Sequence, residues 1–449
     1  MGKKSNLILD VNEKPSIGKW IILALQHVFA MFGATILVPI LVNSAAGAEV
    51  LTIPVTLVAS GIGTLIYILC TKGKSPVYLG SSFAFIAPIT AAYLKGGVSG
   101  AMTGIMAVGL IYVIFAIIIK LVGKNWLDKL LPPVVIGPMI MIIGLGLAPS
   151  AISQIGLTSG AALEWQPIVV ALVSFLVTAI VAVAAKGFLK VIPFLVGIVA
   201  GYLAGVAVGI VDFTPITEAA IVSVPNFIIP FLSYTPNFSA ILTIAPIALV
   251  TIAEHIGDHT ALSAIIDRDL LKDPGLDRTL LGDGIATFVA GAIGGPANTT
   301  YGENTSVVGM TKVASVWVIG LAAVIAIILG FFSKFTALIS TIPNAVLGGV
   351  SLLLYGFIAV NGLKVLIQNQ VDFSNTKNVI VASAMLVLGL GGATISIVSG
   401  DLAVTISGMS LAAIVGIILN LCLPTEKTEE NKPKKEKTKK ATKKEAVKA

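Results

Sequence analysis

The chain has 449 residues, of which 56% are hydrophobic and 11% are charged, and its mean hydropathy is +0.99. No soluble domain needs that much apolar surface, so we expect an all-α polytopic membrane protein embedded in the lipid bilayer. The net charge of +7 does not indicate a nucleic-acid partner, because the stretch 425–449 holds 10 Lys and 5 Glu and supplies most of the excess. We interpret residues 424–449 as a disordered, solvated tail.

About fourteen apolar spans can be drawn, most of them near the 20 residues that a helix needs to cross a membrane. The third span (79–94) and the tenth (299–312) are short, begin with polar residues and are interrupted by Gly or Pro. With the N-terminus inside, the Lys and Arg residues before Thr425 fall in cytoplasmic segments, except Lys95 and Lys334. This positive-inside pattern predicts a multi-pass protein of the cytoplasmic membrane with both termini in the cytoplasm.

Three pairs of motifs recur seven spans apart: Leu25–Ala34 with Ala253–Leu262, Gly80–Phe85 with Asn298–Glu303, and Pro132–Pro138 with Ile342–Gly349. Seven is an odd number, so the second half must enter the membrane with the opposite topology. The pattern predicts two inverted repeats of seven spans each, which is a transporter architecture and not that of an enzyme.

Each short span opens with two hydroxyl residues and an aromatic residue, Ser81-Ser82-Phe83 in one and Thr299-Thr300-Tyr301 in the other. Such residues suit extended backbone, and Gly302 permits close approach to the chain. We therefore predict that each span is a short extended stretch followed by a half-helix, although a simple packing kink is the alternative. Irregular backbone at membrane depth is tolerated where it lines a cavity, and its free N–H groups can bind a ligand.

Two carboxylates, Glu254 and Glu303, lie in stretches that are otherwise typical of membrane spans. A charged side chain there costs about 2.5–3.5 kcal/mol on insertion scales, which makes each residue a candidate for a functional site. On a helix, Glu254 and Asp258 share a face, and His255 and His259 form a neighbouring stripe. A buried hydrogen bond without functional role is the alternative for these residues.

Carboxylates and histidines form the proton relays of membrane transporters, so the candidates for proton coupling are Glu254, Asp258, His259, His27 and His255. Asp283 is interpreted as a structural residue. The cluster lacks a clean spacing of metal ligands, so we predict no metal site and no cofactor, while Na⁺ binding stays open.

The sequence resembles the nucleobase–ascorbate transporter family over nearly the whole membrane part. The resemblance is densest in QHVFAMFGATILVP, KSPVYLGSSFAFIAP, AEHIGDH, DPGLDR, NTTYGEN and GGVSLLLYG. The family signature is Gln or Glu, then Asn-x-Gly, then four residues, Thr and a basic residue. Here the signature begins at Glu303 and ends at Thr311-Lys312, and Ser306 stands where Gly is usual.

The resemblance implies a core domain that slides against a gate domain like an elevator, and it leaves a homodimer open. The implied segments are 18–123 (core, spans 1–4), 131–212 (gate, spans 5–7), 213–238 (extracellular link), 239–335 (core, spans 8–11) and 343–423 (gate, spans 12–14). The implied activity is proton-coupled symport of uracil, with xanthine, urate or another nucleobase as the alternative. An anion transporter or channel on the same scaffold is a further alternative that two carboxylates at the site disfavour.

The resemblance also implies roles for single residues. Glu254 and Glu303 would accept the N–H groups of uracil, and the backbone N–H groups of Phe83 and Gly302 would donate to its carbonyls. The pocket would be lined by Ala34, Phe83, Tyr301 and Tyr355. One departure concerns proton coupling, because Asp258 stands where a His is implicated in the family, so either Asp258 or the adjacent His259 would take that role.

Overall fold

The computed structural model describes residues 7–158, 160, 164–229, 236–399 and 402–424. Its elements are α1 (Ile17–Ala46), α2 (Ile53–Cys70), β1 (Leu79–Ser81), η1 (Phe83–Phe85), α3 (Ile86–Val122), α4 (Asn125–Leu130), α5 (Pro133–Gly146), α6 (Ala148–Ile155), α7 (Trp165–Ala184), η2 (Gly187–Val191), α8 (Pro193–Ala207), α9 (Thr214–Glu218), α11 (Phe238–Ile244), α12 (Ile247–Ile266), η3 (Leu271–Gly275), α13 (Leu276–Ala292), β2 (Asn298–Thr300), α14 (Gly302–Thr311), α15 (Val316–Phe331), α16 (Ser333–Ser340), α17 (Asn344–Gln368), α18 (Thr376–Leu390), β3 (Thr394–Ser399), β4 (Leu402–Ser407) and α19 (Gly408–Cys422).

By length and composition, seven helical stretches in the described part can cross a membrane. An eighth is added if α15 and α16, which meet at a 79° bend, are counted as one span. Shorter apolar helices occur at α8, α18 and α19. The chain is therefore a mostly helical, multi-pass membrane protein, and the number of fourteen spans stays a prediction. The predicted tail at 425–449 lies outside the described residues.

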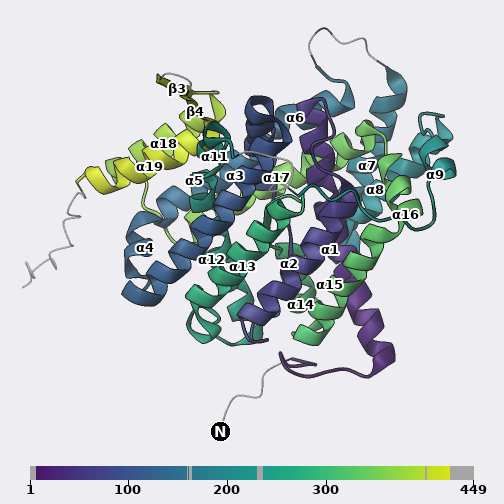
Figure 1. Cartoon of the computed structure of the whole chain (residues 1–449), viewed down its shortest axis with the longest axis horizontal. Helices are drawn as coiled ribbons and strands as arrows, with labels where there is room; N and C mark the ends of the chain where they lie inside the picture. Colours follow the sequence, from purple (N-terminus) through teal and green to yellow (C-terminus); the bar gives the residue numbers. More distant parts are fainter. Residues whose placement is uncertain (1–6, 159, 161–163, 230–235, 400–401, 425–449) are drawn as a thin grey trace, which may run out of the picture.

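The helices pack in two sets (Figure 1). In one set, α13 packs against α3 and α2, α15 packs against α2 and α1, and α11 packs against α3. In the other, α17 packs against α5, α6, α7 and α8, and α18 packs against α5 and α19. Contacts of α12 with α5 and of α1 with α8 join the two sets.

Glycines allow the closest helix approach in each set. A Cβ added to Gly109 of α3 would lie 2.5 Å from the backbone N of Phe288 in α13. A Cβ added to Gly144 of α5 would lie 2.3 Å from the carbonyl O of Tyr355 in α17. Backbone atoms cannot move aside as a flexible side chain can, so these helix pairs depend on small residues, as is common in membrane bundles.

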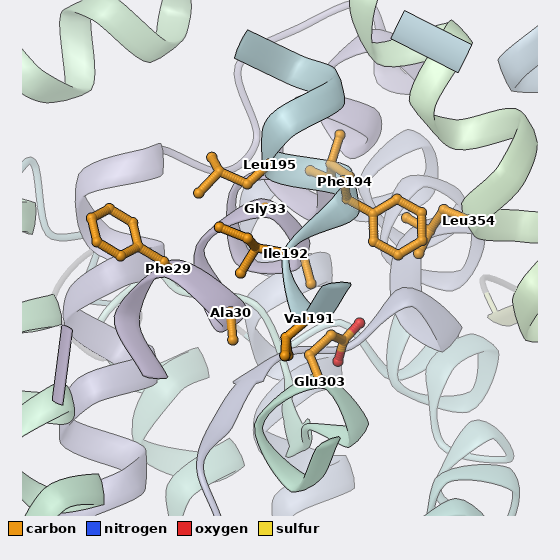
Figure 2. Close-up of a pocket in the computed structure, with 11 residues that line it drawn as sticks. Phe29, Ala30, Gly33, Val191, Ile192, Phe194, Leu195, Glu303 and Leu354 are labelled. Carbon is orange, nitrogen blue, oxygen red and sulfur yellow. The ribbon is translucent and has the colours of Figure 1, made fainter. Parts of the chain in front are cut away.

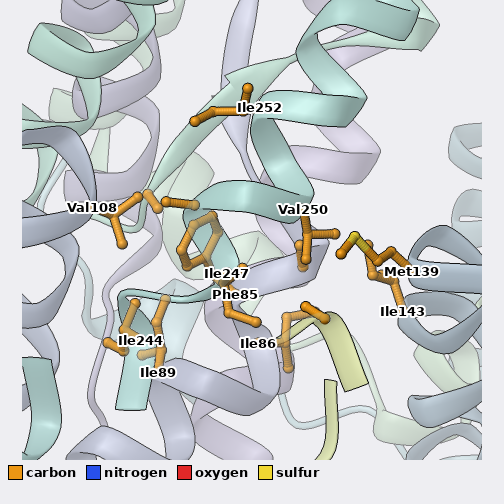
Figure 3. Close-up of a cluster of buried hydrophobic side chains, with 14 of the residues drawn as sticks. Phe85, Ile86, Ile89, Val108, Met139, Ile143, Ile244, Ile247, Val250 and Ile252 are labelled. Carbon is orange, nitrogen blue, oxygen red and sulfur yellow. The ribbon is translucent and has the colours of Figure 1, made fainter. Parts of the chain in front are cut away.

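A large apolar cluster fills the space between α3, α11, α12 and α5 (Figure 3). Phe85 at the end of η1 lies beside Ile247 of α12, Ile89 of α3 lies beside Ile244 of α11, and Met139 and Ile143 approach from α5. All six side chains are buried. The cluster therefore supports α12 directly beneath the stretch that contains Glu254.

The two extended stretches predicted for the short spans are confirmed. β1 and β2 pair in antiparallel fashion, with Leu79 opposite Thr300 and Ser81 opposite Asn298. The buried Asn298 amide also donates to the carbonyls of Ala59 and Ala286, at 3.3 Å each. η1 and α3 follow β1, and α14 follows β2, so two helix N-termini start beside this strand pair.

Three features differ from the sequence-based expectation. The third and fourth spans are joined in one helix, α3, which is interrupted only by the non-helical Gly96 and Gly97. The predicted link at 213–238 contains the short helix α9, and residues 230–235 lie outside the described part. The third difference is an antiparallel hairpin of β3 and β4 between α18 and α19, where we expected the thirteenth and fourteenth spans to adjoin. Its sequence is rich in Thr, Ile and Val, which favour strands.

Candidate functional site

A cavity of about 740 Å³ lies between the two sets of helices. One wall is polar and comes from α12, β2 and α14, with the start of η1 beside them. The other wall comes from α5, η2, α8 and α17 and is mainly apolar: Ile143, Lys190, Val191, Pro193, Phe194, Leu354, Phe357, Ile358 and Asn361. We call these the polar wall and the apolar wall.

Two carboxylates one helical turn apart stand on α12 in the polar wall. Glu254 and Asp258 both line the cavity, as their spacing predicts. The Thr300 hydroxyl of β2 donates a 2.5 Å hydrogen bond to Asp258 Oδ2. The Oε2 atom of Glu254 is buried and has no partner among the described residues. A buried acceptor without a donor costs free energy, and a hydrogen bond from a ligand to this atom would remove that cost.

Glu303 is the third carboxylate of the polar wall, and it lies in the first turn of α14. Figure 2 shows its side chain rising from α14 toward Val191 and Leu354. A small adjoining pocket is lined by Glu303 together with Ala34 of α1. Ala34 therefore lies beside the same carboxylate but does not line the larger cavity.

The two predicted backbone donors open helices. Phe83 is the first residue of η1, and Gly302 is the first residue of α14, and both line the cavity. The first N–H groups of a helix have no acceptor inside the helix and attract polar ligand atoms. Both positions thus suit the donation that we predicted.

Tyr301 lines the cavity between these donors and is fixed by its hydroxyl. Its Oη donates to the carbonyl of Ser81 at 2.9 Å and lies 3.1 Å from the Thr35 hydroxyl and 3.2 Å from the Ser81 hydroxyl. The ring packs so closely that a Cβ on Gly80 would lie 2.4 Å from Tyr301 Cζ. The tyrosine therefore ties β1, α1 and β2 together behind the cavity.

The three histidines do not line this cavity. His255 Nδ1 lies 2.9 Å from Asp283 Oδ2, and His259 contacts the Tyr67 hydroxyl and the His255 carbonyl. His27 Nδ1 lies 3.1 Å from the amide N of Asn304. All three imidazoles are buried. Of the predicted proton-coupling residues, only Glu254 and Asp258 therefore face the cavity.

Tyr355 is buried in α17, and its neighbour Leu354 lines the cavity instead. In the described part of the chain, no group of three or more His, Cys, Asp and Glu has the arrangement of a metal site. Asp283, which we interpreted as structural, is the partner of His255.

Sequence reasoning did not identify the apolar wall. Phe194 and Phe357 meet edge to face with ring centroids 5.9 Å apart, and they link α8 to α17. Asn361, also on α17, and Lys190 on η2 are exposed and supply the polar groups of this wall. These residues resemble ordinary span and loop residues, so only the packing of the two helix sets reveals them.

Comparisons with known proteins agree with this geometry. A family model described as "Permease family" matches residues 18–398. The chain is 48% identical to the uracil permease of Bacillus subtilis over 433 residues, which cover 95% of this chain and 98% of the relative. It is 43% identical to the uracil permease of Escherichia coli, covering 92% and 93% of the two chains. These relatives are permeases and not enzymes.

Solved structures are similar in fold. The transmembrane domain of the cyanobacterial bicarbonate transporter BicA aligns with a TM-score of 0.61 at 16% identity and covers 88% of this chain and 96% of that domain. The murine anion transporter Slc26a9 in the inward-facing state aligns with a TM-score of 0.64 at 13% identity and covers 91% and 68%. At such identities the likeness concerns the fold alone. The family match and the curated relatives show that the chain belongs to the nucleobase–ascorbate transporter family of permeases, as its motifs predicted.

Proposed function

We propose that the protein transports uracil together with protons across the cytoplasmic membrane. The observation that supports this most directly is the polar wall, where acceptor and donor groups stand side by side. Uracil has N–H donors and carbonyl acceptors along one edge of its ring. Carboxylates next to free backbone N–H groups complement such an edge, and two relatives at 43% and 48% identity are named uracil permeases.

In this proposal Glu254 and Glu303 accept the ring N–H groups, and the backbone N–H groups of Phe83 and Gly302 donate to the carbonyls. Tyr301 lines the site, and Ala34 stands at its edge beside Glu303. Tyr355 is buried in α17 and does not line the cavity, so it has no substrate contact in this proposal. Glu in place of Gln at position 303 favours a pyrimidine, because a carboxylate only accepts hydrogen bonds.

Asp258 is the proposed proton carrier. It faces the cavity one turn from Glu254, whereas His259 points to Tyr67. A protonated Asp258 would leave the Thr300 hydroxyl free to accept instead of donate, so one hydrogen bond can serve both protonation states.

We further propose that the first helix set and β1–β2 form the core domain (18–123 and 239–335) and that the second set forms the gate domain (131–212 and 343–423). In this arrangement residues 213–238 are the extracellular link, both termini are cytoplasmic, and the two halves are inverted seven-span repeats. The core would carry its polar wall past the apolar wall in an elevator movement. The grouping of helix contacts supports this division.

Lys190, Gly309 and Met310 line the cavity next to segments that the charge pattern assigns to the cytoplasm. The proposed state is therefore inward-facing. Anion transport, the activity named for the two fold neighbours, is disfavoured here because three carboxylates line the cavity.

The test is uptake of labelled uracil into proteoliposomes that contain the purified protein, with unlabelled uracil, xanthine and urate as competitors. We expect saturable uptake that uracil abolishes and that xanthine and urate leave nearly unchanged. Uptake that xanthine or urate suppresses more strongly than uracil would assign the site to a purine.

A further inference from the structure

A chain of buried polar side chains lies behind α12, on the face that turns away from the cavity. Ser75 lies in the loop after α2, Tyr67 lies in the last turn of α2, and His259 lies on α12. Tyr67 Oη is 2.9 Å from Ser75 Oγ and 2.5 Å from His259 Nε2. The three side chains are fully buried.

This series of hydrogen-bonded side chains continues into a cluster of two histidines and one aspartate. The rings of His259 and His255 stack with their centroids 4.0 Å apart. His255 Nδ1 is 2.9 Å from Asp283 Oδ2 of α13. Two buried atoms of this cluster, His255 Nε2 and Asp283 Oδ1, have no hydrogen-bond partner among the described residues. Unpaired polar atoms in a buried site cost free energy, so a cluster that retains them is a candidate for a functional role.

The tautomer of His259 follows from its partners. Its Nδ1 lies 2.7 Å from the His255 carbonyl, which can only accept, so Nδ1 bears a hydrogen. In the structure Tyr67 donates to Ser75, which fits a protonated His259 whose Nε2 donates to Tyr67. With His259 neutral, Nε2 instead accepts from the Tyr67 hydroxyl, and the Ser75 hydroxyl turns to donate to Tyr67. The two states therefore differ in the direction of these two hydrogen bonds, while the bond from His259 Nδ1 to the His255 carbonyl is unchanged.

We propose that Ser75, Tyr67 and His259 form a proton relay that connects the loop after α2 with the cluster of His259, His255 and Asp283 behind the transport site. A proton that reaches Ser75 Oγ displaces the hydroxyl hydrogen of Ser75 to Tyr67 Oη, and the hydrogen of Tyr67 moves to His259 Nε2. Both hydroxyls keep one hydrogen, and His259 gains the positive charge. The reverse sequence releases the proton.

The surroundings fit such a relay. Tyr67 belongs to a buried apolar cluster that also includes Leu262, Ile266 and Ala286, so apolar side chains surround the relay. At the outer end, Lys74 is the residue next to Ser75, and it forms a surface ion pair with Asp273 at 2.7 Å. The titratable or charged side chains around the relay are Cys70 of α2, Arg278 and Asp283 of α13, and His255 of α12.

The cluster reaches the transport site through space and not through a hydrogen bond. In α12, His255 is the residue next to Glu254 and His259 is the residue next to Asp258, and both carboxylates line the cavity. A proton on the histidine–aspartate cluster therefore changes the electrostatic potential at the substrate-facing carboxylates. This inference rests on the proposed proton-coupled transport, and it adds residues that no substrate touches.

The experiment compares two modes of transport in proteoliposomes for Tyr67→Phe and Ser75→Ala. Net uptake of labelled uracil driven by an inward proton gradient requires that the protein releases its proton in every cycle. Exchange of labelled for unlabelled uracil at equal pH does not require this release, because the proton can stay bound to the protein throughout. For both variants we expect gradient-driven uptake to fall by at least about tenfold, since the proton route to and from the histidine–aspartate cluster is interrupted, while exchange stays within about twofold of wild type.

Tyr112→Phe is the matched control. Tyr112 is also a fully buried tyrosine whose hydroxyl bonds to α12, at Thr251, but it does not contact His259. Both transport modes should change equally in this variant. The relay is refuted if Tyr67→Phe and Ser75→Ala retain gradient-driven uptake, or if they lose uptake and exchange in parallel as a structural defect would. If uracil uptake by the wild-type protein does not depend on the proton gradient, the proposed coupling of uracil transport to protons is itself refuted.

Discussion

The two walls of the cavity differ in how their side chains are held. In the polar wall, hydrogen bonds fix positions: Thr300 holds Asp258, and Tyr301 is bonded to Ser81 and Thr35. In the apolar wall, shape fixes positions through packed rings such as Phe194 and Phe357. Directional bonds provide specificity, whereas apolar contact has no preferred register. In the elevator movement that we propose, the polar wall recognises the substrate and the apolar wall provides the surface past which the polar wall slides.

The largest expected effect comes from the carboxylates of the polar wall. Glu303→Gln and Glu254→Gln each replace an acceptor by a group that also donates, so one hydrogen bond to the substrate is lost and a donor faces a donor. Loss of a charge-assisted hydrogen bond costs about 1.5–3 kcal/mol, which is about 10- to 150-fold in affinity. We expect uracil uptake to fall by at least that factor in cells that contain normal amounts of the variant in the membrane. Undiminished uptake by both variants would remove these residues from the site.

The next effect concerns coupling. Asp258→Asn keeps the size of the side chain and its contact with Thr300 but cannot bind a proton. We expect uracil binding to persist while the stimulation of uptake by an inward proton gradient disappears. The measurement is the ratio of uptake with and without the gradient in proteoliposomes. If Asp258→Asn leaves the ratio of uptake with and without the gradient unchanged, another residue binds the transported proton.

The apolar wall should give a smaller and different effect. Phe194→Ala removes one ring of the pair that links α8 to α17 and opens space opposite Glu303. Truncation of a buried Phe costs about 3–5 kcal/mol of stability, and we expect a partly exposed one to cost less. Uracil affinity should change by less than about fivefold while the maximal rate falls, because the substitution alters the surface that we propose to slide during transport. An affinity loss as large as that of Glu303→Gln would contradict the division between the walls.

Ser306→Gly should have the smallest effect. Position 306 lines the cavity from α14, and the Ser hydroxyl donates to the carbonyl of Gly302 at 2.9 Å within the same helix. The substitution restores the residue that is usual in the family signature and removes only an exposed hydroxyl. Uptake should stay within about twofold of the unmodified protein, since exposed hydrogen bonds contribute little. Thr305, which lines the cavity beside it, offers a comparison through Thr305→Ala.

The sequence predicted the polar wall better than the apolar wall for a physical reason. Carboxylates at membrane depth and paired hydroxyl residues before Gly302 are unusual in a span, so they stand out without a structure. Phe194 and Leu354 look like any lipid-facing or core residue, and only helix packing distinguishes them. For the same reason the face that a histidine turns to is not visible in the sequence, and His27, His255 and His259 were grouped with residues that line the cavity.

Helix boundaries were predictable where Gly or Pro interrupts an apolar run, and less so elsewhere. The strands β1 and β2 were expected because extended backbone was the best interpretation of two short, polar-starting spans. The β3–β4 hairpin was not expected, because its Thr, Ile and Val residues satisfy an apolar span as well as a strand. Composition alone does not separate these two structures in a membrane protein.

The most direct test of the central claim is to record proton movement during uracil transport. Purified protein in liposomes with a pH-sensitive dye outside should raise the external pH when uracil is added, because each transported uracil takes protons from that side. The Glu303→Gln variant should give no signal, and Phe194→Ala should give a slower one. Uracil uptake without any change in external pH would contradict proton-coupled symport by this site.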